Sequence, residues 1–381
     1  MANGSYDVIV IGVGGMGSAT VYQLAVRGKR VLGIERFGIP HEWGSSHGLT
    51  RIIRLAFYEG PEYVPLGRRA YQLWHELEGR LGEQIFHVTG SVHAGPPGSL
   101  DFDQTLKSCI AQDVPHEVLT SAELTSRWPG YRLPSDAMAV VQADGGFLIP
   151  ERCIEGYVAV AREKGAEVHE HERVLGWEAT RKGVRVVTDQ GEYEAGELVV
   201  TAGAWAGSLL PQLQQSLVPE RQVIAWFEPR KPALFEPESF PVFTMSADEG
   251  HFYGFPAHGT PGFKVGKFLH EGNSADPDNL DGVVHDADTD GLRAFTEHNF
   301  PDAAGPLIKA TTCMFTYSPD EHFVIGIHKN FPQVSFAVGF SGHGFKFCST
   351  VGEIMADLAE SGGTAHDISL FDPRRLEGSS A

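Results

Sequence analysis

YDVIVIGVGGMGSATVYQLAVRGKRVLGIE, residues 6–35, is the stretch that decides the fold. It begins with a continuous apolar run, which is typical of a strand buried on both faces of a parallel sheet. A glycine-rich turn and an apolar-periodic segment follow, and a second apolar run ends at Glu35. This order predicts strand, glycine turn, helix and strand, the βαβ unit of dinucleotide-binding folds.

The turn in this stretch carries a GxGxxG fingerprint. The fingerprint runs from residue 12 to residue 17, and the residues in it that we expect to contact the cofactor are Gly12, Gly14, Gly15, Met16 and Gly17. Glycines let the backbone approach a pyrophosphate, whose charge the helix N-terminus stabilises. The carboxylate of Glu35 can accept hydrogen bonds from ribose hydroxyls and disfavours the extra phosphate of NADP. The fingerprint therefore predicts bound NAD or FAD, and a plain tight turn is the alternative interpretation.

Composition and charge limit the class of protein. The chain has 381 residues, 42% of them hydrophobic, which favours an α/β or α+β enzyme of about two domains. A formal net charge of −19 without a Lys/Arg cluster argues against nucleic acid or an anionic membrane as partner. The four cysteines have no CxxC spacing, and the first strand begins too early to leave room for a targeting segment. We expect a cytoplasmic protein without a disulfide framework, a membrane span or a metal site.

Helical and strand patterns alternate through the rest of the chain. Residues 63–82 predict an amphipathic helix. The apolar face of this helix is expected to consist of Leu66, Ala70, Leu73 and Leu77. Residues 83–150 are mixed and poor in strand patterns, whereas 165–200 predict a hairpin followed by a buried strand. Residues 217–325 alternate more weakly and predict a mixed sheet.

Dinucleotide-binding pieces are scattered along the chain, at 6–35, 197–205 and 334–361. A second domain is therefore expected to be inserted between them. We predict an α/β fold in which a Rossmann-like domain is interleaved with an α+β substrate domain built on a mixed antiparallel sheet. The dinucleotide-binding domain is assigned to 1–82, 151–216 and 322–381, and the substrate domain to 83–150 and 217–321.

Two further segments have the composition of a site. GFSGHGFKFCS, residues 339–349, follows an apolar run and leads into a helical pattern, so its backbone N–H groups and helix dipole can face a flat or anionic group. An ordinary connecting loop is the alternative. Within residues 44–54, Arg51 and Arg54 are three apart and close to one face if helical. They could hold a carboxylate, or they could be surface residues or partners of Glu59 and Glu62.

The motifs GVGGMGS, GSSHGLTRIIR, RWPGY, TAGAW, TTCMFTYSPDEHF and GFSGHGFKF, together with Glu35, strongly resemble the monomeric sarcosine oxidase and N-methyltryptophan oxidase family, flavoproteins of the D-amino-acid-oxidase-like group. The resemblance covers nearly the whole chain in order. It implies an FAD-dependent, monomeric oxidase that demethylates an N-methyl amino acid, with sarcosine preferred. The products would be the primary amine, formaldehyde and hydrogen peroxide, with O₂ as the oxidant.

The resemblance also implies roles for residues on the cofactor side. Cys313, in TTCMFT, matches the cysteine that forms a thioether to FAD, although a lone cysteine otherwise suggests core packing. Lys264, in GFKVGKF, matches the lysine that activates O₂, and a surface lysine is the alternative. Arg51 would stabilise the reduced flavin. The other implied cofactor contacts are Arg36, Ser45, Thr50, Val174, Gly342, His343, Gly344, Phe345 and Lys346.

On the substrate side, the resemblance implies that Arg54 and Lys346 together hold the carboxylate and that His343 lies over the ring. The other residues expected to line the substrate pocket are Tyr253, Thr244 and Met245. A concentration of cations in an acidic chain argues against a flavin-binding protein without catalytic activity.

The chain departs from the family pattern mainly on the substrate side. Phe268 comes before His270, Phe315 stands where tyrosine is frequent, and Leu49 stands where aspartate is common. The amine therefore stays open between sarcosine, N-methyltryptophan, pipecolate and a proline-like amino acid. An NAD-dependent dehydrogenase with the same fingerprint is the alternative from another class of enzyme.

Overall fold

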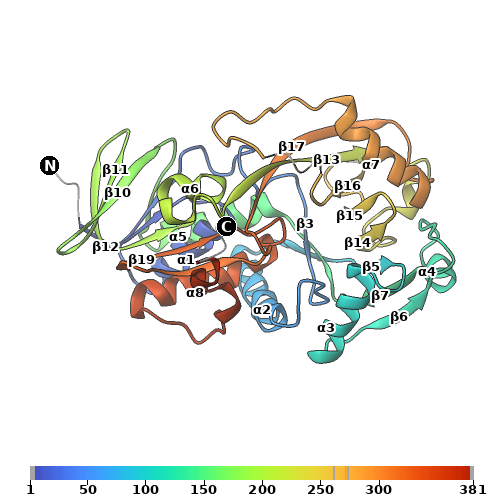
Figure 1. Cartoon of the computed structure of the whole chain (residues 1–381), viewed down its shortest axis with the longest axis horizontal. Coiled ribbons are helices and arrows are strands. Elements are labelled where there is room, and N and C mark those ends of the chain that lie inside the picture. The colour runs from blue at the N-terminus through green and yellow to red at the C-terminus, as the bar shows by residue number, and fades with distance from the viewer. Residues whose placement is uncertain (1–4, 261, 271, 273, 378–381) are drawn as a thin grey trace.

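The computed structural model describes residues 5–377 with the exception of 261, 271 and 273. Within these residues the strands form two eight-stranded sheets and one three-stranded sheet. In Figure 1 the first sheet lies at one end of the molecule with α1, α5 and α8, and the second sheet lies at the other end with α7. This arrangement agrees with the predicted α/β class.

The first sheet follows the order β10-β11-β12-β1-β2-β9, and β19 joins it by pairing with β12 and β18. Its strands are β1 (Ser5–Ile11), β2 (Val31–Ile34), β9 (Glu167–His169), β10 (Val174–Thr180), β11 (Gly183–Thr188), β12 (Glu192–Val200), β18 (Val324–His328) and β19 (Phe331–Val338). The β1 strand pairs in parallel with β2 and β12, and β12 pairs in parallel with β19. The antiparallel pair β10–β11 confirms the predicted hairpin, whereas β9 pairs in parallel with β2.

The continuous apolar run of β1 is explained by two cores. Val8 and Val10 point into the core that contains α1, α2 and α8, while Ile9 and Ile11 point into the core on the opposite face. The helices on this sheet are α1 (Gly15–Val26), α5 (Pro150–Glu163) and α8 (Cys348–Ser361), and α1 contacts both of the others. The predicted βαβ unit is therefore confirmed, and so is the strand, glycine turn and helix of residues 331–361.

The second sheet follows the order β17-β13-β16-β15-β14-β5-β7-β6. Its strands are β5 (Ser91–Gly95), β6 (Glu117–Thr120), β7 (Met138–Gln142), β13 (Val218–Phe227), β14 (Val242–Ala247), β15 (Gly250–Phe255), β16 (Phe263–Lys267) and β17 (Leu307–Tyr317). Its pairs are antiparallel except β5–β14, so the predicted mixed sheet is confirmed. A phenylalanine-rich core packs α7 (Asp286–Asn299) against this sheet.

A small third sheet is built from three short strands in the first half of the chain. It consists of β3 (Arg51–Ile53), β8 (Gly146–Leu148) and β4 (Phe86–Val88) in the order β3-β8-β4. The prediction of a strand-poor segment at 83–150 is wrong, because β4 to β8 all lie within it. These strands have three to five residues each, too few for a clear period-2 pattern. The helical arrangement considered for Arg51 and Arg54 is also wrong, because β3 is extended.

The predicted amphipathic helix is α2 (Tyr63–Leu81), and its four expected apolar residues are all buried. The remaining short helices are α3 (Thr105–Ala111), α4 (Ser121–Arg127) and α6 (Ala206–Leu209). Single helical turns lie at Leu100–Gln104, Gly203–Trp205, Pro211–Leu213, Pro232–Leu234, Phe345–Phe347, Ser369–Phe371 and Pro373–Leu376. Among the described residues, every helix is too short or too polar to cross a bilayer.

The strands of the first two sheets fall within the segments predicted for the two domains. The third sheet crosses that division, because β3 comes from one predicted domain while β8 and β4 come from the other. The domain boundaries themselves stay a prediction. Their outermost residues, 1–4 and 378–381, lie outside the described part of the chain.

Candidate active site

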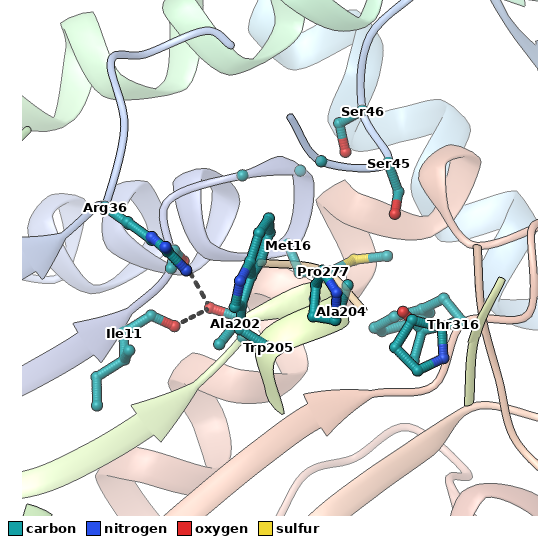
Figure 2. A pocket seen from close by; sticks show the side chains of 18 of the residues that line it. Ile11, Met16, Arg36, Ser45, Ser46, Ala202, Ala204, Trp205, Pro277 and Thr316 are labelled. Carbon is teal, nitrogen blue, oxygen red and sulfur yellow. Dashed lines mark hydrogen bonds between the residues drawn. The ribbon is translucent and has the colours of Figure 1, made fainter. Parts of the chain in front are cut away.

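A cavity of about 630 Å³ opens at the carboxyl end of β1. This volume lies in the range of small-molecule and cofactor sites. The cavity is lined by the glycine turn, by Glu35 and the loop after it, by residues 201–205, and by the glycine loop before α8. Figure 2 shows Met16, Trp205 and Thr316 among the side chains around it. Residues 201–205, at the end of the predicted dinucleotide-binding piece 197–205, therefore line the cavity.

The glycine turn fits a dinucleotide. A Cβ on Gly17 would lie 1.7 Å from the carbonyl oxygen of Gly12, and Gly12 itself has a φ of +86°. A Cβ on Gly14 would meet nothing within 4 Å, so this residue leaves open space at the start of α1. The turn thus packs tightly where the helix meets the strand and is open where a pyrophosphate would lie.

Glu35 is buried and faces the same cavity. Its Oε2 accepts the backbone N–H of Val13 at 2.8 Å, and its Oε1 accepts that of Phe37 at 3.1 Å. Burial raises the pKa of this carboxyl, while the backbone N–H groups act in the opposite direction. Glu35 therefore fixes the glycine turn and the following loop, and its carboxylate lies where a ribose would bind.

The predicted cofactor residues do not all line the large cavity. Those that do are Gly12, Gly14, Gly15, Met16, Glu35, Arg36, Ser45, Arg51, Val174, Gly342, Gly344 and Phe345. Gly17 lies beneath the turn, and Thr50 contacts Lys264 instead. Residues 275–278 also line the cavity and were not predicted. No local motif marks this segment, which reaches the cavity from the part of the chain that builds the second sheet.

A second cavity of about 50 Å³ adjoins the first and shares Arg51, Phe315, Gly342 and Phe345 with it. It brings together five residues that the sequence placed at the substrate, Arg54, Thr244, Tyr253, His343 and Lys346, and also Arg51, which the sequence placed at the flavin. The rest of its lining is largely aromatic and includes Phe255 and Phe268. His343 and Lys346 line this small cavity and, among the described residues, not the large one.

Arg54 is held by a carboxylate of its own chain. Its Nη2 donates to Oε1 and Oε2 of Glu59 at 3.0 and 3.1 Å, and its Nη1 donates to the carbonyl of Ala56. Burial would raise the pKa of Glu59, but Arg54, His343 and Lys346 outweigh it and bring that pKa to about 2. The interpretation of Arg54 as a partner of Glu59 is therefore confirmed, and a substrate carboxylate would meet an arginine that is already paired.

Lys346 and His343 complete this side of the small cavity. The Nζ of Lys346 donates to the carbonyl of His343 at 2.6 Å. Burial lowers the pKa of Lys346 to about 7, against the opposing charge of Glu59. The His343 Nε2 lies 3.0 Å from the carbonyl oxygen of Glu321, so that nitrogen carries a proton. Burial also lowers the pKa of His343, to about 4, so the ring is neutral near pH 7.

Lys264 is buried, which excludes the alternative of a surface lysine. Its neighbours Phe263 and Val265 point into the phenylalanine-rich core, so Lys264 points to the opposite face of β16. Its Nζ donates to the carbonyls of Gly48 and Thr50 at 2.7 and 2.9 Å, and to the Thr50 hydroxyl at 3.0 Å. Burial and the charge of Arg51 lower the pKa of Lys264 well below its ordinary value.

Arg51 lies between the two cavities and lines both. Its Nη1 donates to the carbonyl of Thr50 and its Nη2 to the carbonyl of Ser45, each at 2.9 Å. One loop therefore supplies the acceptors for both Arg51 and Lys264. The guanidinium is fixed without a carboxylate partner among its described hydrogen bonds and ion pairs.

Among the described residues, the predicted site residues Met245, Cys313 and Lys264 line neither cavity. Met245 follows Thr244 on β14 and packs into the phenylalanine-rich core, so the expectation that it lines the pocket is wrong. Successive strand residues face opposite sides, and only Thr244 faces the cavity. Cys313 is buried on β17 beside Phe315 and Tyr253 and, within the described residues, lines neither cavity. Burial raises the pKa of its thiol, while Arg51 and Lys264 lower it.

Comparisons with known proteins agree with this geometry. A family model described as DAO, FAD dependent oxidoreductase, matches residues 7–358. The chain is 45% identical to a monomeric sarcosine oxidase of Streptomyces avermitilis over 377 residues, 98% of each protein. It is 36% identical to an N-methyl-L-tryptophan oxidase of Yersinia pestis over 376 residues, 97% of this chain and 99% of that protein.

Solved structures show the same fold. NikD, an unusual amino acid oxidase essential for nikkomycin biosynthesis, superposes with a TM-score of 0.85 at 27% identity, covering 97% of this chain and 98% of the other. An L-proline dehydrogenase from P. horikoshii has a TM-score of 0.85 at 22% identity, covering 99% of both chains. The glycine turn, the two adjoining cavities and these likenesses agree, and the chain belongs to the DAO family of FAD-dependent oxidoreductases.

Proposed function

We propose that this protein is an FAD-dependent oxidase that demethylates a small N-methyl amino acid, with sarcosine as its substrate. The observation that carries the proposal is the small cavity beside the dinucleotide cavity, lined by Arg51, Arg54 and Lys346. Three cations around one small space favour an anionic substrate, and a bidentate arginine suits a carboxylate. Because the family uses FAD, the NAD-dependent dehydrogenase is set aside.

The chain's own residues would hold FAD in the large cavity. The open space at Gly14 and the N-terminus of α1 would receive the pyrophosphate, and Glu35 would face a ribose. Arg51 would favour negative charge near the boundary between the two cavities. When bound, FAD accepts two electrons from the substrate and passes them to O₂.

Substrate binding would exchange one carboxylate for another. A substrate carboxylate entering the small cavity would compete with Glu59 for Arg54 and would also meet Lys346. The exchange would keep Arg54 paired throughout, while the displaced carboxylate of Glu59 would stay beside His343 and Lys346. The aromatic side chains of Tyr253, Phe268 and Phe315 would exclude water around the amine and favour its uncharged form.

Oxygen would react beside Lys264. A buried cation favours the negative charge that develops when O₂ is reduced. We also propose that Cys313 forms the covalent bond to FAD, because it packs beside Phe315 and Tyr253, which line the small cavity. Burial raises the pKa of its thiol, and the charges of Arg51 and Lys264 oppose that rise. Acid precipitation would leave a yellow pellet if the bond exists, and Cys313→Ser would release the colour into the supernatant. A colourless pellet from the parent protein would disprove covalent attachment.

The function is tested by measuring products. Purified protein supplied with sarcosine and O₂ should form glycine, formaldehyde and hydrogen peroxide in equal amounts. N-methyltryptophan is the decisive competitor, because its indole would not fit a cavity of about 50 Å³ without rearrangement of the aromatic lining. Faster turnover of N-methyltryptophan, pipecolate or proline would replace sarcosine as the substrate. Absence of flavin bleaching by all four amines under anaerobic conditions would overturn the oxidase itself.

A further inference from the structure

The turn that holds Lys264 is itself held by a carboxylate from a distant part of the chain. Glu151 lies in the first turn of α5, and its Oε1 accepts the backbone N–H groups of Gly48 and Leu49 at 2.8 and 3.0 Å. Gly48 and Leu49 have φ angles of +100° and +71°. A leucine in the left-handed region is strained, so the turn needs an external support to keep this shape.

The shape of this turn determines where its carbonyl groups point. The carbonyls of Gly48 and Thr50 both accept from Lys264 Nζ, and the carbonyl of Thr50 also accepts from Arg51 Nη1. The N–H side of the turn therefore contacts Glu151 while its carbonyl side contacts two cations. A shift of the turn would move Lys264 and Arg51 together.

We propose that Glu151 is a positioning residue, which holds the turn at residues 48–50 and thereby keeps Lys264 in place for the reaction with O₂. The inference rests on the proposed function for its kinetic consequence, but its structural part does not. Glu151 contacts neither cavity among the described residues, so it acts only through the turn. Its first-turn position on a helix packed against α1 gives the carboxylate a rigid base.

The charge of Glu151 supports the same assignment. The charged and titratable groups that act on Lys264, or on which Lys264 acts, are Arg51, Glu151, Cys313 and His47. Burial and Arg51 lower the pKa of Lys264, and the carboxylate of Glu151 opposes them. The second oxygen of Glu151 is buried without a hydrogen-bond partner among the described residues, so nearby cations are its electrostatic compensation.

The chain offers a matched control. Glu78 on α2 also accepts two successive backbone N–H groups with one oxygen, those of Ile85 and Phe86, each at 2.9 Å. It lies outside both cavities within the described residues. Replacement of Glu78 therefore reports the cost of losing this kind of loop support where no cation of the site is involved.

The experiment compares Glu151→Ala and Glu151→Gln with Glu78→Ala and Glu78→Gln in purified, flavin-loaded protein. Stopped-flow absorbance measures flavin reduction by sarcosine without O₂ and then reoxidation by O₂. We expect Glu151→Ala to slow reoxidation by about tenfold or more, and to slow reduction by a smaller factor. Glu151→Gln keeps an acceptor oxygen and should recover most of the rate. As the pH is raised, however, reoxidation in Glu151→Gln should begin to slow at a lower pH than in the parent, because the negative charge that favours protonated Lys264 is gone.

A crystal structure of Glu151→Ala supplies a readout independent of activity. We expect the turn at 48–50 to move and Lys264 Nζ to lose at least one of its carbonyl contacts. An unchanged turn, parental reoxidation in Glu151→Ala, or an equal slowing in Glu78→Ala would overturn the inference. Equal rates in Glu151→Ala and Glu151→Gln, without a shift in pH dependence, would overturn it as well. Failure of the proposed function can be told apart from failure of this inference. In the first case the amines would not bleach the flavin of the parent protein, and the crystal structure would still show whether Glu151 holds the turn.

Discussion

Lys264 and Lys346 are both buried, and burial lowers the pKa of each, yet their surroundings differ. The ammonium of Lys264 has three neutral oxygen acceptors from Gly48 and Thr50, one for each of its protons. Lys346 has a single carbonyl acceptor and lies beside the Arg54–Glu59 ion pair. A lysine fully bonded to backbone dipoles is fixed, whereas one beside an ion pair can gain a new anionic partner. The first arrangement suits a side chain held in one position, and the second suits exchange with another carboxylate.

The largest expected effect comes from breaking the ion pair on the Lys346 side. Arg54→Ala would leave Glu59 buried with fewer partners, and loss of one member of a buried pair costs about 3–5 kcal/mol in unfolding free energy. Denaturant unfolding measures the change. The double variant Arg54→Ala with Glu59→Ala should recover part of the loss, because no buried carboxylate is left behind. Parental stability in Arg54→Ala would show that the ion pair does not contribute as the structure indicates.

Removing the fixed cation should act on one half-reaction. Lys264→Met should slow flavin reoxidation by about 10²–10³-fold, the usual effect of losing one preorganised electrostatic group, while reduction by sarcosine changes much less. Stopped-flow measurements separate the two steps. Lys267→Met, on the same strand but without the hydrogen bonds that Lys264 makes to Gly48 and Thr50, is the control. If Lys264→Met reacts with O₂ as fast as the parent, the contrast between the two lysines loses its functional meaning.

A smaller change should come from one of the three acceptors. Thr50→Val removes the hydroxyl contact to Lys264 but leaves both carbonyls, and hydrogen bonds to charged groups contribute about 1.5–3 kcal/mol. Thermal unfolding should report this loss, accompanied by slower reoxidation. Thr50→Ser keeps the hydroxyl and should behave like the parent. Identical stability of Thr50→Val and the parent would show that the third acceptor is dispensable.

The smallest expected effect is a change of carboxylate affinity with pH, caused by the titration of Lys346. Because the pKa of Lys346 is about 7, this side chain is charged below that pH and neutral above it. Binding of a carboxylate without an amine, such as propionate, should therefore weaken by up to about tenfold for each pH unit above that value. Titration of the flavin absorbance measures the Kd. Lys346→Arg stays charged and should abolish the dependence, and a flat profile in the parent would contradict the assigned pKa.

Much of the fold follows from short-range patterns. The apolar run of β1, the glycine turn and the periodicity of α2 depend on residues within a few positions of one another. The strands between 83 and 150 were missed because each is too short to show its period. The wrong assignment of Met245 has a similar cause, since the sequence does not reveal which face of a strand meets the core.

The sequence alone therefore determined the dinucleotide-binding unit, the family resemblance and most of the residues around the small cavity. Only the tertiary structure decided which groups form hydrogen bonds and ion pairs with the charged side chains of the site. The contacts from Glu151 to the turn at 48–49 span 102 and 103 positions, and that from Lys264 to Gly48 spans 216. Such contacts arise when distant strands and helices pack together, and no local periodicity encodes them. Residue type shows that a lysine can carry charge, but only its packed surroundings decide whether that charge is fixed or exchangeable.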